Sequence, residues 1–123
     1  MPATLNASQR LKSEKLIKQV FRERNSALKY PVRLLWKELP GDGKTAAAFS
    51  VSKKHFKRAV DRNRIKRLLR EAYRTQRDSF TASVDAPYAF VFLYVSDRLP
   101  DYKQVCECVA SVMEKWRDAT EGK

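Results

Sequence analysis

The sequence has little of what enzyme active sites and metal centres usually require. Its 123 residues include two cysteines and one histidine. Cys106 and Cys108 are two positions apart, so on a helix they do not face each other, and two thiolates alone cannot complete a tetrahedral zinc site. A Ser-His-Asp triad or a multi-histidine centre would have to be built around His55 alone. We therefore expect a reduced, cytoplasmic protein with no metal centre of its own.

Long apolar runs are also absent. The longest, residues 88–95, is far shorter than the roughly 20 residues that cross a bilayer. The first twelve residues contain no apolar stretch typical of a secretory signal. These absences predict a chain without a membrane-spanning segment or a secretory signal.

Positive charge is what the sequence has in excess. Its 26 Lys and Arg against 14 Asp and Glu give a net charge of +12. Residues 53–77 hold 11 basic and two acidic residues, and residues 1–30 add a net +5, whereas residues 78–123 carry a net −3. Such concentrated charge indicates one basic face for a polyanionic partner, either nucleic acid or an anionic membrane surface.

The hydrophobic pattern predicts a single α+β domain over residues 1–123, with an ordered core at about residues 8–118. Its elements follow the order αββαβα, which predicts a small sheet packed with helices. Helical periodicity covers three segments: residues 8–24, 58–79 and 102–118. Strand patterns cover three others: residues 30–38, 45–52 and 87–96.

Local features of these segments add three predictions. Turn residues at 40–43 predict a hairpin between the first two strands, and Pro31 places the first strand at the sheet edge. The run 87–96 is apolar on both faces, as is typical of a central strand covered on both sides. Cys108 lies in the apolar stripe of the last helix, so we expect a core residue rather than a reactive thiol.

The helix over residues 58–79 has one apolar and one cationic face. The cationic arc holds Arg62, Asn63, Lys66, Arg67, Arg70 and Arg74, and the residues before it include Lys53, Lys54 and Arg58. A solvated helix face usually intersperses acids for pairing, but only Asp61 and Glu71 are present here. Arginine binds phosphate through two parallel hydrogen bonds, and an asparagine amide both donates and accepts. The pattern therefore predicts a nucleic-acid-binding face.

These residues also carry a resemblance to a known family. Ser50-Val51-Ser52-Lys53-Lys54, followed by Arg62-Asn63-Arg64-Ile65-Lys66-Arg67-Leu68-Leu69-Arg70-Glu71, is similar to the signature of the bacterial ribonuclease P protein component. Arg10-Leu11-Lys12 with Val20-Phe21 is similar to that family's first helix. The resemblance covers about residues 9–118, and the length, basic charge and element order agree with it.

The resemblance implies the protein subunit of a ribonucleoprotein that removes the 5′ leader from precursor tRNA. The catalytic RNA subunit is expected to perform the endonucleolytic hydrolysis with magnesium bound mainly by the RNA, and this chain to supply no catalytic residue. The protein is expected to bind the catalytic RNA and the single-stranded leader, without an obligate protein partner. The resemblance also implies a left-handed βαβ crossover over residues 45–95, against the general handedness rule.

The resemblance assigns roles to individual residues. The surface facing the catalytic RNA would consist of Lys53, Lys54, Arg58, Arg62, Asn63, Arg64, Lys66, Arg67, Arg70 and Arg74. Lys12, Ile17 and Phe21 would belong to the leader cleft, although Ile17 stands where the family often has an aromatic residue. Tyr30 or Trp36 would supply an aromatic residue from the strand, with core packing as the alternative for Trp36. Asn63 is a candidate for an outer-shell contact to a metal ion.

Three other functions remain open. A ribosomal-type or duplex nucleic-acid-binding module would place the basic helix in a groove and prefer B-form duplex, because the major groove of A-form RNA is too narrow for side chains. An autonomous nuclease would need converging carboxylates around magnesium, for which the basic helix offers only Asp61 and Glu71, with His55 as a general base. Membrane-surface binding would need the apolar face of the helix, which the predicted core uses.

Overall fold

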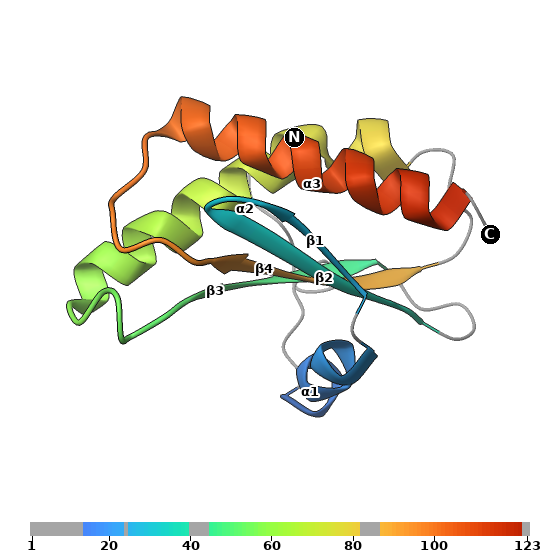
Figure 1. The fold of residues 1–123 in the computed structure, drawn as a ribbon, viewed down its shortest axis with the longest axis horizontal. Coiled ribbons are helices and arrows are strands. Elements are labelled where there is room, and N and C mark those ends of the chain that lie inside the picture. Colours follow the sequence, from blue (N-terminus) through green and yellow to red (C-terminus); the bar gives the residue numbers. More distant parts are fainter. Residues whose placement is uncertain (1–13, 24, 40–44, 82–86, 122–123) are drawn as a thin grey trace.

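The computed structural model describes residues 14–23, 25–39, 45–81 and 87–121. Three layers are visible in Figure 1, with α2 and α3 on one face of a four-stranded sheet and α1 on the other. The predicted α+β class is confirmed. The elements are α1 (Glu14–Glu23), β1 (Ser26–Lys29), β2 (Val32–Glu38), β3 (Ala46–Val51), α2 (Ala59–Thr81), β4 (Tyr88–Tyr94) and α3 (Tyr102–Glu121).

The strand order is β1-β2-β4-β3, with β4 in the interior of the sheet. It pairs antiparallel with β2 and parallel with β3, so Phe92 lies beside Leu34 on one side and Phe49 on the other. This confirms the prediction of a central strand covered on both faces. The predicted hairpin between the strands at residues 30–38 and 45–52 is wrong. These strands are β2 and β3, and β4 lies between them in the sheet. The side chains of β4 are apolar on both faces, so they are better buried in the middle of the sheet than at its edge.

The short strand β1 is the element that the sequence analysis did not predict. It pairs antiparallel with β2, with Ala27 opposite Leu34, so the order is αβββαβα. The predicted edge position of the strand at residues 30–38 is also wrong. That strand is β2, and β1 pairs with its outer side. Pro31 lies in the turn before β2, where no backbone N–H has to join the ladder. Only one residue of β1, Ala27, is buried, which leaves too short an apolar pattern to detect.

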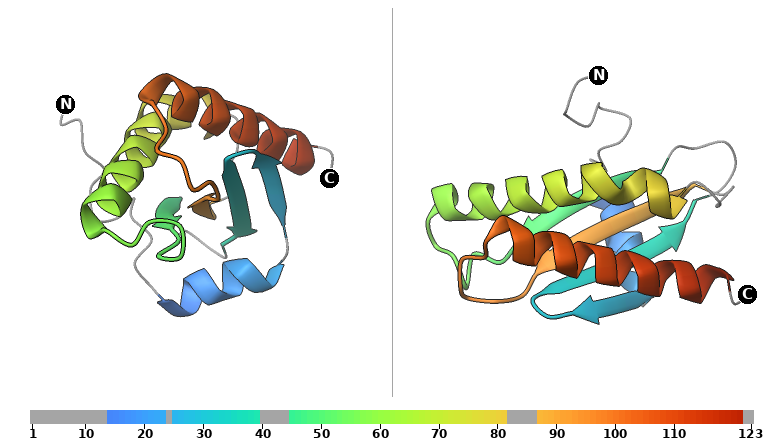
Figure 2. Two further views of the ribbon diagram at one scale, coloured as in Figure 1. Left: turned by 60° about the vertical axis from the view of Figure 1, so that its left-hand side comes forward. Right: turned by 90° about the horizontal axis from the view of Figure 1, so that it is seen from above.

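The connection from β3 through α2 to β4 is left-handed. In the right-hand view of Figure 2, β3 and β4 run side by side toward the left, with α2 in front of the sheet. The chain moves from the upper strand to the lower one, which is the opposite of the usual right-handed crossover. The handedness implied by the resemblance is therefore confirmed.

The main core lies between the sheet and the two helices α2 and α3. Ile65, Leu69, Phe90 and Trp116 are fully buried there, and the rings of Phe90 and Trp116 meet edge to face at 5.0 Å between centroids. Cys108 is also buried in this core, as its position in the apolar stripe predicted.

A smaller core lies between the sheet and α1, around Val20, Leu35 and Val91. Burial on both faces fixes the register of the central strands, because a one-residue slip would exchange the two cores. Within the described ranges, no helix combines the length and apolarity needed to cross a bilayer.

Candidate nucleic-acid interface

The connection between β3 and α2 is a fixed turn that presents two lysines. The Ser52 hydroxyl accepts a hydrogen bond from the Lys54 backbone N–H at 3.1 Å, and the Ser52 carbonyl accepts one from Phe56 N–H at 3.1 Å. The Phe56 side chain is buried, with its ring 6.0 Å from that of Tyr94. Lys53 and Lys54 are therefore held exposed on an anchored loop rather than on a free one.

Arg62 holds the other end of this loop. Its Nη1 donates to the carbonyl of Phe56 at 2.8 Å and to the carbonyl of Lys57 at 2.9 Å. The side chain thus clamps the turn onto the first turn of α2. The family resemblance implied that Arg62 faces the RNA, and the structure gives its guanidinium a role in positioning the loop. Sequence reasoning missed the structural roles of Ser52 and Phe56, because they depend on contacts between the loop and the end of the sheet.

The most accessible part of the cationic face lies beyond this clamp. Asn63, Arg64 and Arg67 are exposed and line a hollow of about 480 Å³ together with Val60 and Asp61. Among the described residues, the guanidinium groups of Arg64 and Arg67 have no hydrogen-bond or ion-pair partner. Both groups can therefore pair with phosphates without first breaking an internal contact.

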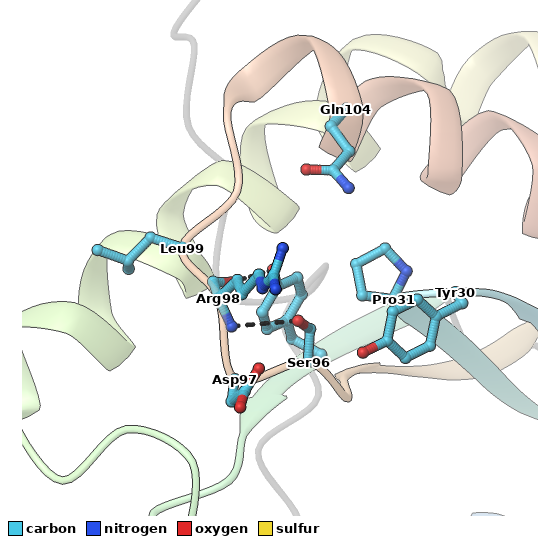
Figure 3. Close-up of a pocket in the computed structure, with 8 residues that line it drawn as sticks. Tyr30, Pro31, Ser96, Asp97, Arg98, Leu99 and Gln104 are labelled. Carbon is cyan, nitrogen blue, oxygen red and sulfur yellow. Dashed lines mark hydrogen bonds between the residues drawn. The ribbon is translucent and has the colours of Figure 1, made fainter.

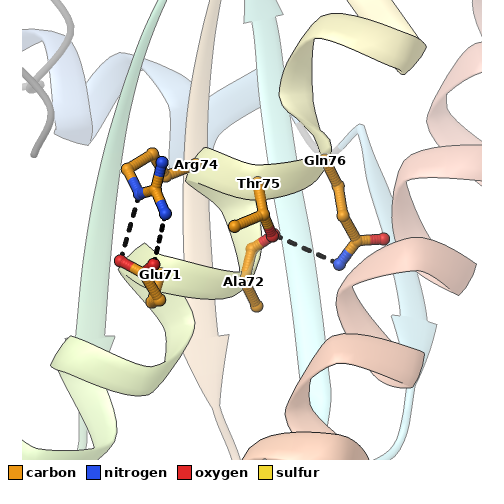
Figure 4. Close-up of polar contacts among 5 residues, drawn as sticks. All are labelled: Glu71, Ala72, Arg74, Thr75 and Gln76. Carbon is orange, nitrogen blue, oxygen red and sulfur yellow. Dashed lines mark hydrogen bonds and ion pairs between the residues drawn. The ribbon is translucent and has the colours of Figure 1, made fainter. Parts of the chain in front are cut away.

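Further along α2, the cationic side chains are tied to neighbouring groups. The guanidinium carbon of Arg70 lies 5.8 Å from the centroid of the Phe49 ring, within the range of a cation–π contact. The Arg74 Nε donates to Glu71 Oε2 at 3.1 Å, and a second contact joins Nη2 to Oε1 (Figure 4). The hydrogen bond from Arg74 lowers the pKa of the Glu71 carboxyl. Arg74 therefore offers less free charge to a ligand than Arg67 does.

The remaining predicted residues extend this surface. Arg58 is exposed just before α2, Lys66 is half-buried on the helix, and His55 is exposed in the loop. The two carboxylates near the cationic face have different surroundings. Asp61 lines the hollow, whereas Glu71 pairs with Arg74. Among the described residues, no three His, Cys, Asp or Glu side chains gather to hold a metal ion.

The opposite face of the sheet carries the residues expected to contact the leader. Ile17 is half-buried against the smaller core, and Phe21 is 46% exposed on α1. A 2.8 Å ion pair between Lys37 Nζ and Glu23 Oε1 ties the end of α1 to β2, and it lowers the pKa of the Glu23 carboxyl. Lys12, the third predicted residue, lies outside the described residues.

The two aromatic candidates on the strand have different positions. Trp36 is buried in the core on the α2–α3 side of the sheet, in agreement with the core-packing alternative. Tyr30 precedes β2 in the turn and is 65% exposed. On the side facing α1, β2 contributes the apolar Leu35 next to Lys37, and sequence reasoning missed Leu35. The strand is apolar at Leu34, Leu35 and Trp36 in succession, so alternation could not reveal its register.

The chain is similar to known proteins of one family. The sequence model of the family described as Ribonuclease P matches residues 5–117. A ribonuclease P protein component of Porphyromonas gingivalis (strain ATCC 33277) is 40% identical over 112 residues, covering 85% of this chain and 81% of the relative. A ribonuclease P protein component of Chlorobaculum tepidum is 58% identical over a shorter stretch of 36 residues, which covers 29% of this chain and 23% of the relative.

Solved structures show the same fold at lower sequence identity. The RNase P protein from Thermotoga maritima superposes with a TM-score of 0.70 at 19% identity, covering 86% of this chain and 96% of that one. The RNase P protein of Staphylococcus aureus gives a TM-score of 0.69 at 20% identity, covering 87% and 94% of the two chains.

Proposed function

Because this chain belongs to the ribonuclease P protein family, as the protein subunit that partners with the RNA of a tRNA-processing ribonuclease, we propose that it binds that RNA through α2 and the loop before it. The observation that carries the proposal is the group of free, exposed cations at Arg64 and Arg67, next to an anchored loop that presents Lys53 and Lys54. A loop that is already ordered loses little conformational entropy when it binds.

The binding energy of this surface is proposed to be mainly electrostatic. Each phosphate that a cation neutralises releases condensed counterions, so affinity falls as salt rises. With about 5–8 phosphates engaged by the exposed and half-buried cations, the log–log salt slope should lie at about −4 to −7. Loss of one engaged arginine should weaken binding and reduce the magnitude of that slope by about one.

We propose that the RNA subunit performs the hydrolysis with magnesium that it binds itself. Magnesium prefers oxygen ligands and usually takes one or two carboxylates together with phosphates. Near the cationic face of α2, Glu71 is engaged by Arg74, which leaves Asp61 as the free carboxylate. Among the residues that the structure describes, those near this face therefore do not fit an autonomous magnesium site. Asn63, beside Asp61 in the hollow, remains a candidate for contact to the water shell of an RNA-bound ion.

We propose that the face around α1 contacts the single-stranded leader of precursor tRNA. Phe21 offers an exposed ring on which a base can stack, and Ile17 offers apolar contact without a planar face. Lys12 is proposed to add charge to this surface. Binding of the RNA subunit and binding of the leader would then use opposite faces of the sheet.

The test is cleavage of precursor tRNA by a ribonuclease P RNA at low magnesium, with and without the protein. We expect the wild-type protein to stimulate cleavage and Arg67→Ala to stimulate it less. Lys103→Ala removes the same charge from an exposed position on α3 and should behave as wild type. A series of leader lengths with Phe21→Ala then tests the α1 face.

Two outcomes would contradict the proposal. If the wild-type protein does not stimulate cleavage yet binds B-form duplex, the generic binding module is favoured. If Arg67→Ala and Lys103→Ala stimulate cleavage equally, the RNA-binding surface lies elsewhere on the protein.

A further inference from the structure

A second hollow lies at one end of the sheet, apart from the cationic arc of α2. Its volume is about 510 Å³, within the range of sites that bind small organic groups. Three segments form it: the turn between β1 and β2, the end of β4, and the loop that leads into α3. Figure 3 shows Tyr30 and Pro31 on one side, Arg98 on the other, and Gln104 reaching down from α3.

The backbone around this hollow is held by hydrogen bonds within its segments, between them and to α3. Four hydrogen bonds hold it: Cys108 Sγ to the Tyr30 carbonyl at 3.7 Å, Val95 N–H to the Pro31 carbonyl at 2.8 Å, Arg98 N–H to Ser96 Oγ at 3.1 Å, and the Tyr94 hydroxyl to the Arg98 carbonyl. The walls therefore keep their shape without a ligand.

The side chains that point into the hollow are, by contrast, uncommitted. Tyr30 is 65% exposed, and Arg98 and Gln104 are exposed as well. In the part of the chain that the structure describes, neither the Arg98 guanidinium nor the Gln104 amide has a hydrogen-bond partner. The hydrogen-bonded backbone of the hollow thus presents the exposed ring of Tyr30, the exposed guanidinium of Arg98 and the exposed amide of Gln104.

This set of groups matches the parts of one nucleotide. A tyrosine ring is a stacking platform for a base, and an arginine binds a phosphate through charge-assisted hydrogen bonds. The Gln104 amide can donate to and accept from a base edge. The Asp97 carboxylate, at the opposite end of the hollow from Gln104 (Figure 3), makes that end unsuitable for a bare polyanion.

The hollow adjoins the basic loop. The Phe56 ring, which anchors the loop carrying Lys53 and Lys54, lies 6.0 Å from the Tyr94 ring, and Tyr94 lines the hollow. An RNA strand whose phosphates contact the loop lysines can therefore continue toward Tyr30.

We propose that this hollow is a second RNA-binding subsite, which takes one unpaired nucleotide with its base on Tyr30, its phosphate at Arg98 and its base edge at Gln104. The base must be unpaired because a base within a duplex has no free face for the tyrosine ring. The proposal rests on the RNA-binding function proposed above. The nucleotide can belong to the RNA subunit or to the substrate, and the shared chemistry is an unstacked nucleotide.

The test uses the full chain and two fluorescent RNAs in separate arms, a ribonuclease P RNA and a precursor tRNA with a single-stranded leader. We expect Tyr30→Ala to weaken binding in one of the arms by about 5- to 150-fold, the range for loss of one base–aromatic stack. Tyr30→Phe keeps the ring and should bind as wild type. Arg98→Ala should reduce the magnitude of the salt slope by about 0.7, the value for one phosphate of a single strand. Lys103→Ala, which removes the same charge outside the hollow, should leave the slope unchanged.

The arm in which Tyr30→Ala acts identifies which RNA supplies the nucleotide. Equal binding of wild type, Tyr30→Ala and Arg98→Ala in both arms, while Arg67→Ala binds more weakly, overturns the subsite and leaves the α2 surface intact. If Arg67→Ala is also without effect, the proposed RNA-binding surface fails as well. Because Tyr30 and Arg98 are exposed, their variants should unfold at the wild-type temperature, and a thermal scan checks this.

Discussion

Arg62 and Arg67 carry the same charge on the same helix, but they have different contacts. Arg62 donates from Nη1 to two carbonyls of the preceding loop, at 2.8 and 2.9 Å. Arg67 is exposed and lines the hollow on α2. Replacement of each by alanine removes one positive charge. We expect Arg62→Ala to lower stability and Arg67→Ala to leave it nearly unchanged.

The magnitude follows from the two hydrogen bonds of Arg62. A hydrogen bond from a charged donor contributes about 1.5–3 kcal/mol when it is protected, and less when it is exposed. One of the two bonds is partly buried and the other is exposed, so their joint contribution is about 2 kcal/mol. For 123 residues the unfolding entropy is about 0.26 kcal/mol per degree. The unfolding temperature should therefore fall by about 8 °C in Arg62→Ala and by no more than about 2 °C in Arg67→Ala.

The assay is thermal unfolding without RNA, followed by RNA titration at several salt concentrations. Arg67→Ala should reduce the magnitude of the salt slope by about one while its unfolding temperature stays near that of wild type. The reasoning is refuted if Arg62→Ala unfolds at the wild-type temperature and weakens RNA binding as Arg67→Ala does. Arg62 would then be an RNA contact and not a clamp.

Three further predictions concern the core. Leu69→Ala should destabilise the protein by about 2–5 kcal/mol in urea unfolding, because Leu69 is fully buried, and the half-exposed Leu99→Ala should change stability by less than about 0.5 kcal/mol. Burial raises the pKa of the Tyr73 hydroxyl to about 12, above an unfolded value near 10, so its contribution is present below pH 10 and is lost as pH rises to 12. The loss is about 2–3 kcal/mol in wild type and should be missing in Tyr73→Phe when the two are unfolded in urea at pH 9 and pH 12. Burial also raises the pKa of the Cys108 thiol, so a thiol reagent should label Cys106 first and Cys108 only on unfolding; equal rates would contradict this.

The features that the sequence predicted correctly are those with a strong period or a strong charge bias. The two-faced helix α2, the doubly apolar strand β4 and the buried Cys108 all follow from side-chain pattern alone. The strand order did not follow, because a turn signal indicates that the chain reverses but not which strand lies beside it. The strand β1 was missed because its pairing with β2 is specified by the partner rather than by its own residues.

The candidate interface divides in the same way. The spacing of arginines predicted a cationic face that includes Arg67, and Arg67 is exposed there; Arg64, which only the family resemblance named, is exposed as well. The spacing of arginines did not predict that Arg62 and Arg74 are engaged by other groups, because those contacts depend on a loop conformation and on one rotamer. The stacking hollow at Tyr30 was also beyond sequence reasoning, since its walls come from segments that are distant along the chain.

The interior position of β4 has a consequence for the order in which the chain can fold. The ribosome makes β2 and β3 before β4, yet neither can complete its pairing until β4 is inserted between them. The β1–β2 hairpin can form early from local contacts, but β3 keeps an open edge while α2 is already synthesised. A nascent chain that stops before residue 88 therefore carries the cationic helix without a finished sheet to support it. Such a chain is exposed both to strand-to-strand aggregation and to indiscriminate capture by nearby RNA.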